Sequence, residues 1–590
     1  MTFTFRVAAA ASLMIGIAAG GVGAQIIRSA TTPDTTRAKV VERERTPYEA
    51  ARAVQADFEF FRSMNLPAFR GGRPGNCDER VGRFCYWYDE TASAPPELSA
   101  VIDRRAELTR ALDSLGRRDA NDTWILAQRV RYLVEDQRPA EALQAARECT
   151  TGTWWCDVMT GFALHMLGEY ERADSVYAVG LTKMLPRDRC AWDDISLLLD
   201  NDALQSYRRL PCDDPKRAAY EDRAWWYART LYMMHGNDSR TEHYARMTMA
   251  LILTDAATPH QFGFDDDERE LMLRFGWSIA WMRAPSSNPR GARTFDIISH
   301  ESVPAYRYIP AGFVLNNPAV SDSADWRLQL PPVMGRYAPP YAKTVRALQH
   351  QKAMFRRGDT ALVVVSYDAN EFDEFRGTNL ESAITVSAGG VPRAYQARRS
   401  STNPAGILTV RAPWGPLIMS AEVAAPEKYA IARARYGMSP PYAVGTRVSL
   451  SDLLFFKPYG SFPANADEAI PHALPTERVM ADEKLGVFWE AYGTDPAGER
   501  MTISVTVERE VEDASSFLRR GARVFGLGRE VTPVRVSVQD MSARGTPTSA
   551  RALELDISTL PRGAYVVNLE VEVAGQYVIR AEHRIEIVGP

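Results

Sequence analysis

The chain has 590 residues, of which 45% are hydrophobic and 24% are charged, and its 74 acidic and 70 basic side chains leave a net charge of -4. This length and composition are typical of a globular protein with roughly three or four domains. The near balance of charge argues against nucleic acid as the main partner, because neutralising phosphates requires a concentrated basic face.

Residues 1–24 have the pattern of a cleavable secretory signal. Arg6 precedes an apolar run from Val7 to Ala19, and Val22-Gly23-Ala24 stands before Gln25. The run is too short to span a bilayer, so we expect no transmembrane span in the mature chain. The sequence therefore predicts an exported protein, periplasmic or secreted after cleavage near Ala24. An uncleaved anchor is the alternative.

The six cysteines form an even set, which predicts disulfides in an oxidising compartment. They fall into three local groups separated by short loops. The spacings lack the Cys-x-x-Cys form of zinc sites, so we do not expect the cysteines to bind metal. No cofactor is expected either. The expected pairs are Cys77 with Cys85, Cys149 with Cys156, and Cys190 with Cys212.

A flexible spacer is predicted at residues 25–45, which are mostly polar, and a helical domain at residues 46–285. Within this domain, the stretch from Trp124 to Met184 predicts two successive helical hairpins. Small and aromatic residues recur in the second hairpin, and a shift of 31 residues aligns Ala142 with Ala173. This pattern resembles a tetratricopeptide repeat, in which small residues allow close helix packing. Two unrelated amphipathic helices are the alternative. The recurring residues are Gly161, Leu164, Gly168, Tyr170, Ala173, Tyr177 and Gly180.

The most distinctive polar residues follow the predicted hairpins. Trp225-Trp226 precedes the run from Gly236 to Arg246, which reads GNDSRTEHYAR, and Arg274-Phe275-Gly276-Trp277 comes later. This order resembles the GWxTD-domain proteins, a family of exported bacterial proteins of unknown function. The resemblance covers residues 223–283 and supplies no catalytic residues. Ile279 and Ala280 stand where that family has Thr and Asp.

Four of these polar residues, Arg240, Glu242, His243 and Arg246, are the candidate binding residues. Ser239 and Glu242 have the spacing of a capping box. The two arginines and His243 lie on overlapping faces within about two helical turns, so a carboxylate-bearing partner can meet all three. The alternative is an internal salt-bridge network at a domain seam, with the acids of residues 265–268.

No catalytic residues are predicted. A metallohydrolase would need a second ligand on the helix of His243, but Met247 occupies the position four residues later, and only Glu242 and His300 remain to join it. The sequence contains no Gly-x-Ser-x-Gly, Walker A or Gly-x-Gly-x-x-Gly motif between a predicted strand and a predicted helix. An envelope hydrolase or processing enzyme with its site around Glu242 and His243 is nevertheless the alternative function.

The second half of the chain predicts β structure. A Pro-rich linker is expected at residues 286–345, an antiparallel β-sandwich at 346–440 and an immunoglobulin-like β-sandwich at 441–590. The turn from Leu560 to Tyr565 resembles the tyrosine corner of immunoglobulin-like domains. The predicted fold is therefore multi-domain, α then β. The predicted function is that of an exported, non-enzymatic interaction or scaffold protein of the cell envelope, with a protein or peptide partner.

Overall fold

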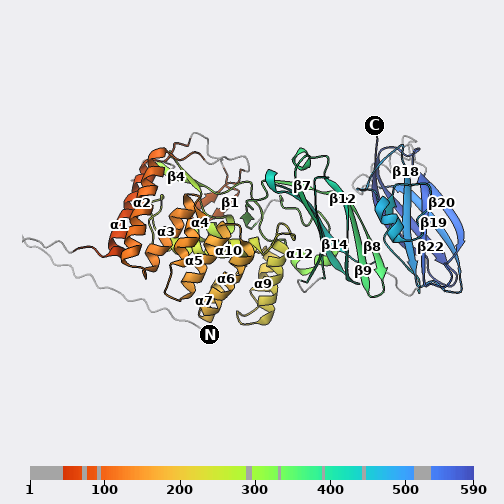
Figure 1. Ribbon diagram of the computed structural model, residues 1–590, viewed down its shortest axis with the longest axis horizontal. Helices are drawn as coiled ribbons and strands as arrows, with labels where there is room; N and C mark the ends of the chain where they lie inside the picture. The colour runs from red at the N-terminus through yellow and green to blue at the C-terminus, as the bar shows by residue number, and fades with distance from the viewer. Residues whose placement is uncertain are drawn as a thin grey trace, which may run out of the picture. The chain divides into compact units, whose positions relative to one another are not determined.

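The structure is a computed structural model that describes residues 44–69, 76–89, 95–286, 295–329, 334–388, 393–440, 447–510 and 533–589. The predicted signal peptide at 1–24 and nearly all of the predicted spacer lie outside these ranges. Helices dominate the described chain as far as Phe275, and strands dominate after it (Figure 1). The predicted order, α then β, is confirmed.

The helical half begins with α1 (Pro47–Met64) and α2 (Ser99–Arg118), which are followed by two hairpins. In the second hairpin, the position of a Cβ on Gly161 would lie 3.0 Å from the ring of Tyr177, so a larger residue there would push the two helices apart. Side chains from both hairpins, including Val130, Ala146 and Phe162, share one core. The hairpins consist of α3 (Thr123–Glu135) with α4 (Pro139–Arg147) and α5 (Trp154–Met166) with α6 (Tyr170–Lys183).

All three predicted disulfides are present. Cys77–Cys85 closes the small hairpin of β1 (Glu79–Val81) and β2 (Phe84–Tyr86), with its Cα atoms 5.3 Å apart. Cys149–Cys156 joins the end of α4 to the start of α5, with a Cα separation of 5.5 Å. Cys190–Cys212, at 5.8 Å, links α7 (Pro186–Asp193) to the loop before α9 (Pro215–Ala228) and encloses α8 (Asn201–Tyr207).

Helix α10 (Asp238–Thr254) lies against α5, α6 and α3, and α11 (Asp266–Phe275) packs beside it. Thirteen of the 17 residues of α10 are buried, including charged ones. A helix that is buried on every side must find internal partners for its polar groups, because unpaired polar atoms are costly away from water.

The described part of the predicted linker contains several short elements. β4 pairs with β3, β5 pairs with β6, and the α12–η2 segment follows β5. Four aromatic side chains of this region, Tyr306, Tyr308, Trp326 and Tyr337, are buried. The elements are β3 (Ala280–Pro285), β4 (Phe295–His300), β5 (Tyr306–Arg307), α12 (Gly312–Asn316), η2 (Pro318–Val320) and β6 (Arg336–Tyr337).

Two sheets follow, with strand orders β11-β10-β13-β14-β7 and β12-β9-β8. The strands pair antiparallel, except for the parallel pair of β14 and β7. Val363, Ile384 and Met419 belong to the core that the two sheets share. The strands are β7 (Thr344–Ala347), β8 (Gln349–Arg357), β9 (Thr360–Asp368), β10 (Leu380–Ala388), β11 (Ala394–Ser401), β12 (Ala405–Pro413), β13 (Leu417–Ala425) and β14 (Ala430–Met438).

A second pair of sheets completes the described chain. One has the order β15-β18-β16, with β21 also on β18, and the other has the order β17-β23-β22-β19-β20. The Tyr565 hydroxyl donates to the Pro561 carbonyl at 2.7 Å and ties the turn to the sheet, as predicted. The strands are β15 (Ser449–Leu450), β16 (Leu454–Phe456), β17 (Arg478–Met480), β18 (Lys484–Tyr492), β19 (Arg500–Arg509), β20 (Val534–Met541), β21 (Thr548–Asp556), β22 (Gly563–Val573) and β23 (Ile579–Val588).

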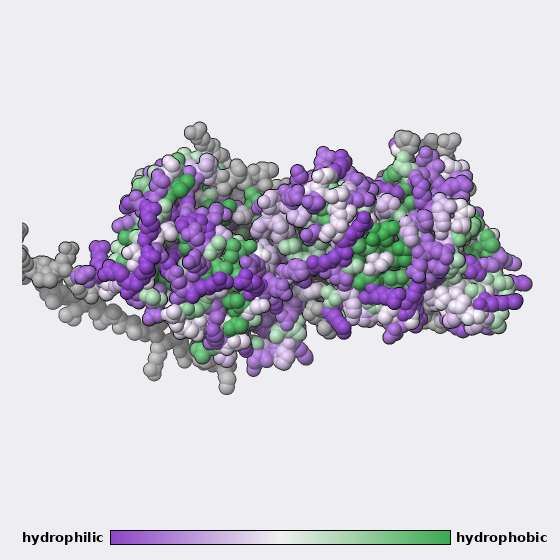
Figure 2. Space-filling view, in the orientation of Figure 1, coloured by the Kyte–Doolittle hydropathy of each residue, from purple (hydrophilic) through white to green (hydrophobic). Residues whose placement is uncertain are grey.

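The three-stranded sheet is covered on both faces. Val363 and Val365 of β9 face the core shared with β10 and β13, whereas Val364 belongs to a cluster with Leu454 and Phe488 of the second pair of sheets. Burial on both faces explains the unbroken apolar run in β9. Hydrophilic side chains predominate on the face drawn in Figure 2. Among the described helices, none is long and apolar enough to cross a bilayer.

Candidate functional site around helix α10

A glycine turn sets the start of α10. Gly236 has a φ of +79°, and a Cβ at this position would lie 2.3 Å from the backbone nitrogen of Glu171 at the start of α6. Asn237 then caps the helix, because its side-chain oxygen accepts from the Arg240 nitrogen at 3.0 Å. The capping box predicted for Ser239 and Glu242 is wrong. The Ser239 hydroxyl instead donates to the Ala228 carbonyl at 3.1 Å.

Glu242 occupies the centre of a buried charge network. Its Oε1 accepts from Arg246 Nε at 2.7 Å, and its Oε2 lies 2.8 Å from His165 Nε2. Burial alone would raise the pKa of Glu242, but the positive charge of Arg246 and the hydrogen bond from His165 outweigh burial and lower the pKa to about 2. Glu242 is therefore a stable carboxylate and a poor general base near neutral pH.

Arg246 connects α10 to two other elements. Its Nη1 donates to the Leu273 carbonyl of α11 at 3.0 Å, and its Nη2 donates to the Arg336 carbonyl of β6 at 2.8 Å. The guanidinium also lies 4.5 Å from the ring centroid of Tyr308. These contacts use the planar fork of arginine, which a lysine cannot reproduce.

His165, on α5, has both ring nitrogens engaged by protein atoms. Nδ1 lies 2.9 Å from the Thr241 hydroxyl, and Nε2 lies next to Glu242. A carboxylate only accepts, so Nε2 must carry a proton. Neither nitrogen is left to exchange a proton with a ligand, and a general-base role for His165 has no geometric support.

The four predicted binding residues do not converge on one ligand. His243 is 1% exposed and its Nε2 lies 2.9 Å from the Trp192 carbonyl. Burial lowers the pKa of His243 to about 4. Arg240 points elsewhere, with its Nε donating to Asp174 at 2.8 Å. Of the four residues, Glu242 and Arg246 line the pocket described below, and Arg240 and His243 do not.

The alternative interpretation of these residues was a salt-bridge network that includes the acids of residues 265–268. Asp265 and Glu268 instead cap α11 and pair with Arg83, at 2.6 and 3.1 Å. Nor do Glu242, His243 and His300 gather as a metal site would require, since the described residues contain no group of three metal-ligating side chains in suitable geometry.

We call the cavity beside this network the hairpin pocket. It has a volume of about 260 Å³ and lies between the α5–α6 turn, α10 and the residues that follow α11. The Tyr337 hydroxyl is buried in its wall. The lining residues are His165, Met166, Leu167, Gly168, Tyr170, Glu242, Arg246, Phe275, Gly276, Trp277, Ser302, Tyr337, Ala338 and Pro340.

Glu242 and Arg246, which line this pocket, are two of the four binding residues expected from the sequence. Gly276 and Trp277 belong to the GWxTD-like segment, and Tyr170 belongs to the predicted hairpin. His165 also lines the pocket and is buried. Ser302 and Tyr337 lie in the predicted linker, where no local pattern marked them.

Neither a family model nor a curated protein matches the sequence. Among solved structures, red sea bream transglutaminase matches with 11% identity and a TM-score of 0.14, over 41% of this chain and 32% of that one. Bacteroides uniformis β-glucuronidase 2 matches with 9% identity and a TM-score of 0.16, over 39% and 26%. The alignments thus span about a third or less of those chains. Likeness at these TM-scores carries no argument about fold or function.

Proposed function

We propose that this chain is an exported, non-enzymatic interaction protein of the cell envelope that binds a protein or peptide partner. One observation carries the proposal. The charged groups beside the hairpin pocket are paired with one another, whereas its wall offers the rings of Tyr170, Phe275, Trp277 and Tyr337. Such a wall suits an apolar side chain of a partner and leaves no free base for catalysis.

Export is supported by the signal-like pattern of residues 1–24 and by the three disulfides, which are typical of oxidising compartments. We therefore propose that the mature protein lies in the periplasm or outside the cell.

The finer structural assignments belong to the same proposal. The hairpins from Trp124 to Met184 are taken as tetratricopeptide-like, and the two pairs of sheets as sandwiches, the second one immunoglobulin-like. The Tyr565–Pro561 hydrogen bond supports the latter. Membership of the GWxTD-domain family is part of the same proposal and rests on the order of the sequence motifs in residues 223–283.

The hairpin pocket has room for one large side chain, so we propose that it holds an aromatic or aliphatic anchor residue of the partner. Aromatic walls contribute about 0.5 to 1.5 kcal/mol per ring pair beyond simple burial. Such central anchors commonly carry much of the binding free energy of an interface.

The test is capture of a partner from a bacterial envelope extract by the purified mature protein after chemical crosslinking. Ser302→Trp fills the pocket from its wall, and Ser206→Trp places the same side chain on the exposed face of α8 as a control. We expect Ser302→Trp to reduce capture of the wild-type partner at least tenfold and Ser206→Trp to leave it unchanged.

Two results would contradict this proposal in different ways. Equal capture by wild type and Ser302→Trp would exclude the hairpin pocket as the binding site. Recovery of no specific partner by the folded protein would exclude the interaction function itself. Circular dichroism of each variant confirms that the comparison is made between folded proteins.

A further inference from the structure

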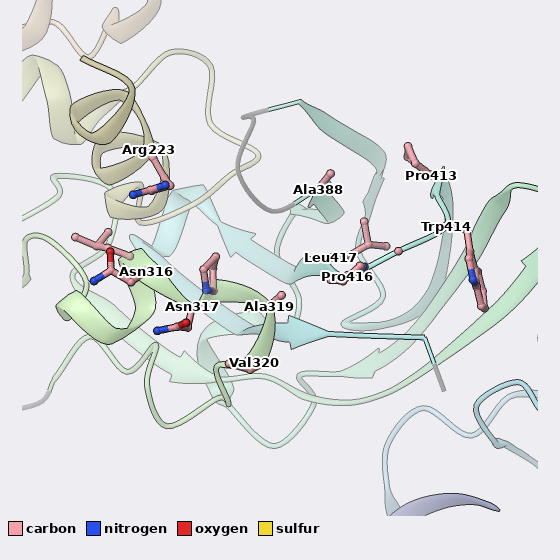
Figure 3. A pocket seen from close by; sticks show the side chains of 13 residues that line it. Arg223, Asn316, Asn317, Ala319, Val320, Ala388, Pro413, Trp414, Pro416 and Leu417 are labelled. Carbon is pink, nitrogen blue, oxygen red and sulfur yellow. The ribbon is translucent and has the colours of Figure 1, made fainter. Parts of the chain in front are cut away.

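A second pocket, of about 620 Å³, lies where α9, the α12–η2 segment and the turn between β12 and β13 meet (Figure 3). We call it the Arg223 pocket. It shares no lining residue with the hairpin pocket. Its volume is within the usual range for a ligand site and exceeds that of a single side chain.

Arg223, on α9, is the charged group of this pocket. Within the described chain, no carboxylate pairs with it, and its buried Nε has no hydrogen-bond acceptor. Its nearest aromatic contact is the Tyr220 ring, at 5.1 Å from the guanidinium carbon. Arg217, on the same helix, instead pairs with both Asp194 and Glu221. The guanidinium of Arg223 is therefore available to an anion from outside the described chain.

The polar side chains of the pocket lie towards one end. Figure 3 shows Arg223, Asn316 and Asn317 on one side and Trp414 on the other. Both asparagines are exposed, so their amide groups can donate to a ligand. Val320 lines the pocket and remains 71% exposed, which marks apolar surface that nothing in the described chain covers.

The walls are held in place by the sheets behind them. The position of a Cβ on Gly437 would lie 2.3 Å from the carbonyl carbon of Ala319, so η2 rests directly on the backbone of β14. The Gly437 nitrogen also donates to the Ser321 carbonyl at 2.9 Å. On the other wall, the Trp414 nitrogen donates to the Asp359 carbonyl at 3.0 Å. A pocket formed in advance loses little conformational entropy on binding.

We propose that the Arg223 pocket binds an extended segment of a partner protein in which an Asp or Glu side chain is flanked by apolar residues. The carboxylate pairs with the Arg223 guanidinium, whose fork matches a carboxylate in geometry. The flanking side chains pack on Trp414 and Leu417. An acidic sugar fits less well, because the side chains of Pro413, Pro416 and Leu417 offer no hydrogen-bonding groups for its hydroxyls.

This inference rests on the proposed function in taking a peptide as the ligand, but it uses different residues. An experiment on the Arg223 pocket can therefore fail while the hairpin pocket still binds its partner. The reverse also holds, because direct peptide binding does not depend on capture from an extract.

The test uses the full mature protein and an array of octapeptides that are acetylated and amidated, so that no terminal charge remains. Each peptide carries one central Glu among apolar residues, and a matched array carries Gln at that position. We expect wild type to bind the best Glu peptides at least tenfold more tightly than their Gln counterparts in fluorescence anisotropy. Arg223→Gln should abolish this preference. Arg209→Gln, which removes an exposed arginine of the loop after α8, should retain it.

Gly437→Ala provides an independent perturbation, because it leaves Arg223 in place and displaces η2 from β14. We expect it to weaken binding of the Glu peptides about tenfold or more. The inference is overturned if Glu and Gln peptides bind equally or if Arg223→Gln retains the preference. It is also overturned if only peptides with a free C-terminal carboxylate bind, or if polygalacturonate binds through Arg223 while the Glu peptides do not.

Discussion

On α10, buried charged side chains are stabilised by pairing with other side chains. Glu242 accepts from Arg246 and from His165, so both of its carboxylate oxygens are paired within the protein. A buried pair of this kind contributes little compared with a well-packed apolar pair, but removing one partner leaves the other charge buried and uncompensated. The network is therefore sensitive to single substitutions.

We expect Glu242→Gln to lower the free energy of unfolding by about 3 to 5 kcal/mol, because Arg246 would remain buried beside a neutral amide. Denaturation by guanidinium chloride measures this change. Glu107→Gln, which breaks the exposed pair with Arg104 on α2, serves as the control and should leave the unfolding midpoint unchanged. Similar losses for both variants would show that Glu242 is not stabilised as described.

The lowered pKa of His243 predicts that the free energy of unfolding depends on pH. Its pKa is about 4 in the folded protein, below the ordinary value of about 6.5, so the unfolded chain binds more protons between these two pH values. The free energy of unfolding should be unaffected by His243 above pH 6.5 and should fall as the pH drops towards 4. Relative to His243→Gln, wild type should lose about 1.4 kcal/mol per pH unit in this window.

The measurement is chemical denaturation of both proteins at several pH values between 7 and 4. Only the difference between the two curves is informative, because Glu221 and Glu301 act in the opposite sense. Burial raises the pKa of each of these carboxyl groups to about 7. Parallel curves for wild type and His243→Gln would contradict the assignment.

The sequence indicated which residues of α10 are unusual but not what they contact. Glu242 and His165 are 77 positions apart, and Arg246 reaches a carbonyl 90 positions away. Pairing at such separations depends on tertiary packing, for which local spacing carries no signal. The predicted capping box was wrong for the same reason. Asn237 is the N-cap of α10, and the buried side chain of Glu242 pairs with Arg246 and His165 instead.

At the scale of secondary-structure elements, the turn before α10 shows how one glycine positions a helix. Gly236 combines a positive φ with direct contact between its backbone and the start of α6. Gly358, in the turn between β8 and β9, has a comparable φ of +67° and nothing within 4 Å of its Cβ position. Substitutions at the two glycines therefore distinguish two contributions to the free energy of unfolding. Both include the cost of a left-handed backbone, and only the one at Gly236 adds a steric clash.

We expect Gly358→Ala to lower the free energy of unfolding by about 1 to 2 kcal/mol, the cost of a left-handed conformation for an L-residue. Gly236→Ala should lower it by about 1 to 3 kcal/mol more, because the new methyl group meets the backbone of Tyr170 and Glu171. Thermal and chemical denaturation measure both variants. Equal losses would mean that α6 does not restrain this turn.

Elements with strong local patterns were predictable. The hairpins between Trp124 and Met184 follow from the spacing of small and aromatic residues, and β9 follows from its apolar run. The two-residue strands β5 and β6 were not predictable, since each depends on a partner about 30 positions away. The parallel pairing of β14 with β7 had no sequence signal either.

On the scale of the whole molecule, one buried ion pair joins the loop after α9 to β13. Glu422 accepts from the nitrogens of Tyr232 and Met233 at 2.8 and 2.9 Å and from Arg435 at 3.1 Å. Arg435 in turn donates to the Arg229 carbonyl at 2.8 Å. These bonds link the last residues of the helical array to the five-stranded sheet, and they lie on chain segments almost 200 positions apart.

We expect Glu422→Gln to lower the free energy of unfolding by about 3 to 5 kcal/mol and to increase hydrogen exchange at residues 229–234. Glu427→Gln is the matched control, because Glu427 is exposed near the end of the same strand and accepts only from Thr378 and Asn379. Unchanged exchange at residues 229–234 in Glu422→Gln would show that the sheet does not hold this loop.

The order of helices and strands was predictable because the composition changes near residue 285 and short apolar runs typical of strands follow the Pro-rich stretch. The burial of both faces of β13 was not, because it depends on which element covers the second face. In β13, Met419 faces the sheet core, whereas Glu422 faces the helical array. Both faces of such a strand are buried, so apolar and polar residues do not alternate in a way that shows which face meets the core.

The connectivity of the three disulfides has a consequence for the route by which the chain matures. Each cysteine is bonded to the next cysteine along the sequence. If the polypeptide is threaded outward from its N-terminus, every thiol meets its correct partner before a later competitor emerges. Oxidation can then proceed in step with translocation, and reshuffling of mispaired bonds by an isomerase becomes unnecessary.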